Sequence, residues 1–229
     1  AKLGHLIQNK YPREQVAAFA LEFLETAPAA NRVRISYARY LIDQQASAAA
    51  LEQFRKVLDR DPENTAALMS AGLLSIQEER YGEARQYLKR HLELTPDNDQ
   101  IRVYLGQIAE EQERYADAEK WYRAVSSDQQ LFDARLRLGT VIYEREGLEA
   151  ALDHLETLNT EDENEFVRLA LTKELVLRKA DDLDRAKSVL DDAASRDKVI
   201  DAIRTYFALG GLQLQVTVVD REALLDAQR

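Results

Sequence analysis

One period of the chain, residues 65–98, reads TAALMSAGLLSIQEERYGEARQYLKRHLELTPDN. Apolar residues in its first half recur at the spacing of one helix face, a polar break follows, and the second half resumes the pattern. Pro96 closes the period, because proline cannot continue the interior of a helix. The stretch therefore predicts two amphipathic helices joined by a short turn.

The layout of this period recurs at a nearly fixed interval. Small residues at one phase are 34, 34, 34 and 33 residues apart, namely Gly4, Ala38, Gly72, Gly106 and Gly139. The same 34-residue interval separates three prolines, Pro28, Pro62 and Pro96. A repeat of this length is typical of small units that bury their apolar faces only by stacking on copies of themselves. We therefore predict an all-α solenoid of tandem helix-turn-helix units.

The repeat divides the chain into seven segments. We expect a partial unit at residues 1–30, full units at 31–64, 65–98, 99–131 and 132–166, a divergent unit at 167–200, and a degenerate or partial unit at 201–229. Gly4 already lies at the phase of a first helix, so we expect the array to continue upstream of residue 1. Glu174 stands where glycine is expected, which predicts a looser hairpin in the divergent unit. In the last segment, residues 212–218 alternate apolar and polar side chains, so an extended segment or strand is an alternative there.

Small residues in both halves of each unit predict a close contact between its two helices. They lie 12 residues apart on opposite arms, in the pairs Ala38/Ala50, Gly72/Ala84, Gly106/Ala118 and Gly139/Ala151. Large residues are expected to fill the space beside each pair, namely Phe54, Leu88, Tyr122 and Leu155. A glycine inside a helix costs roughly 1 kcal/mol relative to alanine, so glycines at one phase indicate a packing role.

Charge and composition disfavour several kinds of partner. The chain has 41 acidic and 31 basic residues and a net charge of -10, so its field repels phosphate backbones and anionic lipid headgroups. No apolar run approaches the length of a membrane span. The chain has no cysteine, which removes disulfides and thiolate sites. We therefore expect other proteins or peptide segments as partners, with no nucleic acid and no membrane span.

The sequence contains no recognisable catalytic constellation. None of the histidines has metal-ligand spacing around it, and these are His5, His91 and His154. Glycine-rich phosphate loops are absent. Three aspartates flank the proline turns, where helix capping explains them better than acid-base chemistry, namely Asp61, Asp97 and Asp99. We therefore expect no enzyme, no catalytic residue, no metal and no cofactor.

The repeat resembles the tetratricopeptide repeat (TPR) family over residues 1 to about 196. The matching residues include Leu-Gly in the first helix and Ala with an aromatic or leucine in the second, as in Leu105-Gly106, Ala118 and Tyr122, and in Gly72, Ala84, Leu88 and Pro96. The early tryptophan of the family is replaced by Arg34, Leu68, Arg102 and Arg135. The resemblance implies a right-handed α-solenoid that binds proteins or peptides in a concave groove.

The resemblance also assigns groove residues by register. Five positions of each first helix face inward in the family, and they predict a protein-binding groove at Arg32, Ile35, Arg39, Met69, Leu73, Ile76, Val103, Gln107, Leu136 and Tyr143. An exposed apolar strip of Met69, Leu73 and Ile76 would suit a peptide or an amphipathic helix. The alternative is that neighbouring helices cover this strip. The Lys and Asn clamp of TPR co-chaperones is missing, so binding of acidic chaperone tails is not expected.

A second, shorter resemblance concerns residues 101–127. This stretch looks like TPR lipoproteins of proteobacteria, which sit on the inner face of the outer membrane as adaptors, one group of them delivering cell-wall hydrolases to a carboxyl-terminal processing protease. It implies a bacterial periplasmic scaffold or adaptor, anchored through a lipoprotein segment that precedes residue 1, that recruits envelope enzymes to a protease. A cytoplasmic location is the alternative. The rival function is a structural module that self-associates into homo-oligomers.

Overall fold

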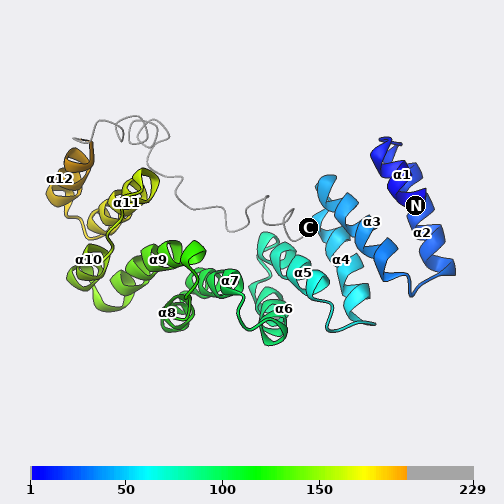
Figure 1. Ribbon diagram of the computed structural model, residues 1–229, viewed down its shortest axis with the longest axis horizontal. Coiled ribbons are helices and arrows are strands. Elements are labelled where there is room, and N and C mark those ends of the chain that lie inside the picture. The colour runs from blue at the N-terminus through cyan, green and yellow to red at the C-terminus, as the bar shows by residue number, and fades with distance from the viewer. Residues whose placement is uncertain (1, 195–229) are drawn as a thin grey trace. The chain divides into compact units, whose positions relative to one another are not determined.

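The computed structural model describes residues 2–194, which contain twelve α-helices and no strand (Figure 1). The helices in the first half are α1 (Lys2–Gln8), α2 (Arg13–Thr26), α3 (Asn31–Asp43), α4 (Ser47–Leu58), α5 (Thr65–Gln77) and α6 (Tyr81–Leu94). Those in the second half are α7 (Asp99–Glu111), α8 (Tyr115–Arg123), α9 (Asp128–Glu146), α10 (Leu148–Glu156), α11 (Glu163–Lys179) and α12 (Leu183–Ala194). The predicted all-α class is confirmed. The expected irregular segment at 201–229 lies outside the described residues.

The helices form two compact units, one with α1–α6 and the other with α7–α12. Within each unit, an odd-numbered helix packs against the even-numbered helix that follows it, giving a series of helical hairpins. We call the odd-numbered helices the first helices and the even-numbered ones the second helices. Successive hairpins also contact one another, through α4 and α5 in the first unit and through α9 and α11 in the second. These hairpins have the layout predicted from the repeat. None of the described helices is both long and apolar enough to cross a membrane.

The turns inside the hairpins repeat the same backbone conformation. In five of them a non-glycine residue has a positive φ between 52° and 61°, namely Lys10, Gln45, Glu79, Glu113 and Asp181. The turn between α9 and α10 uses Gly147 instead, with a φ of 93°. Because this left-handed region is costly for residues other than glycine, its recurrence reflects a turn geometry fixed by the packing of the two helices.

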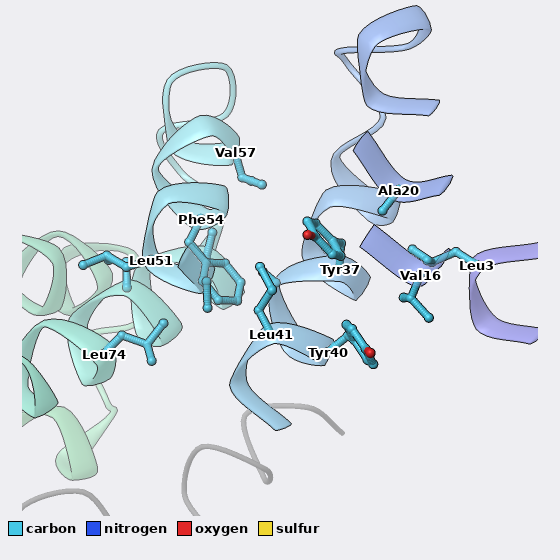
Figure 2. Close-up of a cluster of buried hydrophobic side chains, with 14 residues drawn as sticks. Leu3, Val16, Ala20, Tyr37, Tyr40, Leu41, Leu51, Phe54, Val57 and Leu74 are labelled. Carbon is cyan, nitrogen blue, oxygen red and sulfur yellow. The ribbon is translucent and has the colours of Figure 1, made fainter. Parts of the chain in front are cut away.

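Apolar side chains of consecutive helices form the core of the first unit (Figure 2). Val16 of α2 lies near Leu3 of α1, and Leu41 of α3 lies beside Phe54 of α4. The core continues into α5 through Leu74. All of these side chains are 5% exposed or less, so each hairpin completes the core of its neighbour.

The repeated glycines make room for the large residues of the second helices. A Cβ added at Gly72 would lie 2.7 Å from Cδ2 of Leu88. A Cβ at Gly106 would overlap the ring of Tyr122, and one at Gly139 would overlap Leu155. The large residue 16 positions after each of these glycines therefore fills the space beside it, as expected, and the contact with the alanine 12 positions later stays a prediction.

Candidate protein-binding surface

The residues predicted for the groove differ in accessibility. Arg32 is exposed, and four others are half-buried, namely Ile35, Arg39, Met69 and Tyr143. The remaining five are buried, namely Leu73, Ile76, Val103, Gln107 and Leu136. The accessible part of the predicted set therefore lies on α3, at Met69 of α5, and on α9.

Of the two interpretations of the apolar strip on α5, exposed or covered by neighbouring helices, the structure agrees with the covered one. Leu73 is 1% exposed and Ile76 is 4% exposed, and only Met69 of the three retains partial exposure. The reason is the composition of α5, which is apolar or small on every face between Ala67 and Ile76. A helix that is apolar all round is buried on all sides. Direct contact of Leu73 or Ile76 with a partner stays a prediction. Their burial does not favour it.

A polar network connects three helices of the second unit. The hydroxyl of Tyr122 on α8 donates to the carboxylate of Glu110 on α7, and Nη1 of Arg137 on α9 lies 3.5 Å from Oε1 of Glu110. With its amide oriented to satisfy both partners, Gln107 accepts from Nε and Nη2 of Arg137 at 3.2 and 3.1 Å. Burial raises the pKa of Glu110, and the charge of Arg137 opposes that shift. Gln107 is thus part of an internal network, which the sequence reading did not assign.

Two ion pairs join α9 and α11 on the accessible surface of the second unit. Nη1 of Arg168 lies 2.6 Å from Oδ1 of Asp133, and Nζ of Lys179 lies 2.5 Å from Oε1 of Glu144. The Lys179 ammonium is also 5.8 Å from the ring centroid of Tyr143, which is within cation–π range. The sequence reading missed Arg168 and Lys179. The sequence does contain a signal for these pairs, because each cation lies about one repeat after its acidic partner, on the next first helix.

Asp99 links the start of α7 to the loop before α9. Its Oδ2 accepts from the backbone N–H groups of Ser126 and Ser127 at 2.8 and 2.6 Å, and its Oδ1 pairs with Arg102. Burial alone would raise the pKa of Asp99, but these hydrogen bonds and the Arg102 charge outweigh it and hold that pKa below its ordinary value.

The expected capping role of the aspartates is wrong for α5 and α7, the helices that follow two of the proline turns. Asn64 and Asn98 cap α5 and α7, accepting from the backbone N–H of Ala67 and Ile101 at 3.0 and 3.3 Å. Asp61 is not the cap itself. Its Oδ2 accepts a hydrogen bond from the Asn64 amide at 2.9 Å and so orients the side chain that caps α5. The cap residues at these two helix starts are therefore asparagines, and Asp61 holds one of them in place.

The two histidines on second helices are packed into the structure. Oγ1 of Thr95 lies 2.7 Å from Nδ1 of His91, and Nε2 of His154 donates to the carbonyl of Arg135 at 2.8 Å. Burial lowers the pKa of both histidines. Within residues 2–194, no group of three or more His, Asp or Glu side chains is arranged to hold a metal ion.

Comparisons with known proteins agree with this architecture. Two sequence profiles described as tetratricopeptide repeat match residues 35–99 and 75–137. No curated protein matches the sequence. Among solved structures, MamA protein superposes with a TM-score of 0.62 at 19% identity, covering 74% of this chain and 92% of that chain. MamA from Desulfovibrio magneticus RS-1 gives a TM-score of 0.58 at 16% identity, covering 73% of this chain and 97% of that chain.

A third solved structure is that of YrrB, described as a TPR protein with an unusual peptide-binding site. It superposes with a TM-score of 0.56 at 20% identity, covering 81% of this chain and 96% of that chain. At these identities the likenesses show the fold alone. The matched profiles identify tetratricopeptide repeats over residues 35–137, and the stacked hairpins have the fold of the solved tetratricopeptide repeat structures. The predicted family is confirmed, and the family supports a protein-interaction scaffold in general.

Proposed function

We propose that this chain is a non-catalytic adaptor that binds segments of partner proteins on its first helices. The observation that carries the proposal is the accessible surface between α9 and α11. There, Tyr143 is flanked by Lys179 and Glu144, with Asp133 and Arg168 on the same two helices. In the first unit, a second accessible surface on a first helix consists of Arg32, Ile35 and Arg39 of α3.

The chemistry of the α9–α11 surface suits a protein segment better than a small substrate. A half-buried tyrosine offers a large amphipathic contact area, which is typical of the residues that dominate binding energy at interfaces. The surrounding ion pairs are exposed, and such pairs contribute about 0–1 kcal/mol each. A partner with complementary charges can therefore exchange them at little cost, and the charges then determine which partner fits.

The finer part of the proposal concerns the setting. We propose that the adaptor works in the bacterial periplasm, anchored at the outer membrane, and brings envelope enzymes to a protease. The support is the resemblance of residues 101–127 to proteobacterial TPR lipoproteins. The peptide-binding site described for YrrB further supports peptide segments as ligands. Fractionation of source cells into periplasm, cytoplasm and outer membrane tests the location, and a purely cytoplasmic distribution would exclude it.

Affinity capture with matched variants tests the binding surface. The double variant Tyr143→Glu and Lys179→Glu should lose a partner that the wild type captures from source cells. Lys187→Glu changes an exposed residue of the second helix α12 and should retain that partner. Capture that is equal for the wild type and the double variant would reject the α9–α11 surface.

The alternative function is a self-associating structural module. Exposed apolar side chains gather on the first hairpin, where Tyr11 is 41%, Leu21 47% and Phe23 38% exposed. Light scattering over a hundredfold range of concentration separates the two functions. An adaptor keeps one mass over this range, whereas a self-assembling module grows, and the variant Phe23→Ser should then stop its growth.

A further inference from the structure

An open hollow of about 550 Å³ lies in the first unit. Its lining residues come from α2, α3, α4 and the loop after α4, and they are Leu21, Leu24, Glu25, Arg34, Gln53, Lys56, Asp59 and Arg60. A volume of this size is in the range of ligand-binding pockets. The hollow is separate from the α9–α11 surface, so an inference from it does not rest on the proposed function.

Arg34 is the buried cation of this hollow. The residue is 6% exposed. Its Nη1 donates to Oε1 of Gln53 at 2.9 Å and its Nη2 donates to the carbonyl of Pro28 at 3.3 Å, whereas its buried Nε has no acceptor. No carboxylate within residues 2–194 forms an ion pair with Arg34.

A buried guanidinium without an anionic partner is unusual. Buried charges in proteins are generally paired, because removing them from water costs free energy that a counter-charge offsets. Burial, followed by the nearby charge of Arg60, lowers the pKa of Arg34, which is the direction expected for a cation with no anion beside it. Arg34 therefore has no carboxylate in direct contact, although Glu25 and Asp59 line the same hollow.

The remaining lining residues define what kind of anion fits. Lys56 and Arg60 add two positive charges to that of Arg34, and Glu25 and Asp59 add two negative charges, so the lining has a net charge of +1 (3 - 2). This balance matches one monoanionic group better than a dianionic phosphate. Leu21 is 47% exposed at the hollow and gives it an apolar wall next to the cations.

We propose that this hollow binds a carboxylate of a peptide segment from a partner protein, with an apolar neighbour of that carboxylate resting on Leu21. Arg34 and Arg60 offer charge-assisted hydrogen bonds to the carboxylate, which are stronger than neutral ones. The planar guanidinium suits this role better than an ammonium does, because its donors match the two carboxylate oxygens.

Titration of the full chain with three matched peptides tests the class of ligand. The probes are acetyl-Ala-Leu-Glu-Leu-Ala-amide, the same peptide with Gln in place of Glu, and the same peptide with phosphoserine in place of Glu. Binding is followed by calorimetry and by the NMR signal of the Arg34 Nε–H. The Glu peptide should bind saturably and at least about tenfold more tightly than the Gln peptide, the effect of one charge-assisted hydrogen bond. Equal binding of the Glu and Gln peptides, or tighter binding of the phosphoserine peptide, would overturn the proposal.

Variants of the lining residues locate the site. Arg34→Met and Arg60→Gln should each weaken binding of the Glu peptide, the former at least about tenfold. Leu21→Ser should weaken the Glu and Gln peptides alike. Arg13→Met, an exposed cation of α2 outside the hollow, should bind as the wild type does. If Arg34→Met fails to fold, Arg60→Gln decides, because Arg60 is exposed. Two results would contradict the site. In the first, both variants bind the Glu peptide as tightly as the wild type does. In the second, Arg34→Met misfolds and Arg60→Gln binds as tightly as the wild type does.

Discussion

At the scale of single residues, Asp99 shows how one carboxylate joins two parts of the second unit. It is buried at the start of α7 and accepts hydrogen bonds from two backbone N–H groups of the loop that leads into α9. Those N–H groups would otherwise lack partners near the beginning of a helix. The contact thus fixes where α9 begins relative to α7, which in turn places the polar network of Glu110 and Arg137.

We expect Asp99→Asn to destabilise the second unit by about 1.5–3 kcal/mol, because hydrogen bonds to a buried charged group are lost or weakened. Differential scanning calorimetry should show this as a lower unfolding temperature. Asp97→Asn is the control, since Asp97 is exposed and its replacement should change stability by no more than about 0.5 kcal/mol. Equal effects of the two substitutions would show that the Ser126 and Ser127 contacts are unimportant.

The contribution of Asp99 should also depend on pH. Its pKa in the folded chain lies below the ordinary value of 3.8, so the ionised form stabilises the fold above that pH. As the pH falls through the folded pKa, Asp99 becomes protonated and the contribution disappears. The difference in unfolding free energy between wild type and Asp99→Asn should therefore be constant at neutral pH and shrink below about pH 4. Urea unfolding at a series of pH values measures this difference in unfolding free energy. A difference that grows toward low pH would contradict a lowered pKa of Asp99 in the folded chain.

At the scale of helices and hairpins, the glycine of each first helix sets how closely the second helix approaches. We expect Gly106→Ala to destabilise the chain by about 1–3 kcal/mol, because the new methyl group overlaps the buried ring of Tyr122. Gly82→Ala is the matched control in helix α6, where an added Cβ meets nothing within 4 Å. The control should be neutral or gain up to about 1 kcal/mol of helix propensity. Thermal unfolding of both variants tests the claim, which fails if Gly106→Ala is as stable as the wild type.

The hairpins were predictable from the sequence because their signals are local and periodic. Gly72 and Pro96 fix the phase and the end of one unit, and the 3.6-residue apolar pattern fixes which residues share a helix face. The choice of Asn64 over Asp61 as the cap was not predictable from residue type alone, because both side chains are good caps. Which of them reaches the free N–H groups depends on the turn geometry.

The accessible surface was less predictable than the hairpins. Register correctly places Tyr143 among partly accessible residues, but it also selects Leu73 and Ile76, which are buried. A register gives the direction of a side chain and not the extent to which other side chains cover it. Arg34 is a second case in which the sequence does not show how neighbouring helices surround a side chain. Its replacement of a tryptophan is visible in the sequence, whereas its unpaired charge and the hollow beside it follow only from the packing of α2, α3 and α4.

At the scale of the whole molecule, residues 2–194 form two units of stacked hairpins, and each unit has one of the two surfaces proposed to bind partner segments. The accessible charges of the second unit lie on α9 and α11, and the hollow of the first unit is lined by α2, α3, α4 and the loop after α4. The two surfaces differ in composition, because the former pairs its charges internally and the latter leaves Arg34 unpaired. They are therefore expected to select different partner segments.

Site-specific photocrosslinking in source cells tests the central claim that partners bind the first helices. A photoreactive phenylalanine derivative is placed at Ser36 of α3 and at Glu144 of α9, and for comparison at Gln86 of α6 and Asp153 of α10, all four being exposed. The account predicts crosslinks to a distinct partner protein from positions 36 or 144, with none to that protein from positions 86 and 153. Crosslinks to a partner from the second-helix positions alone would contradict it.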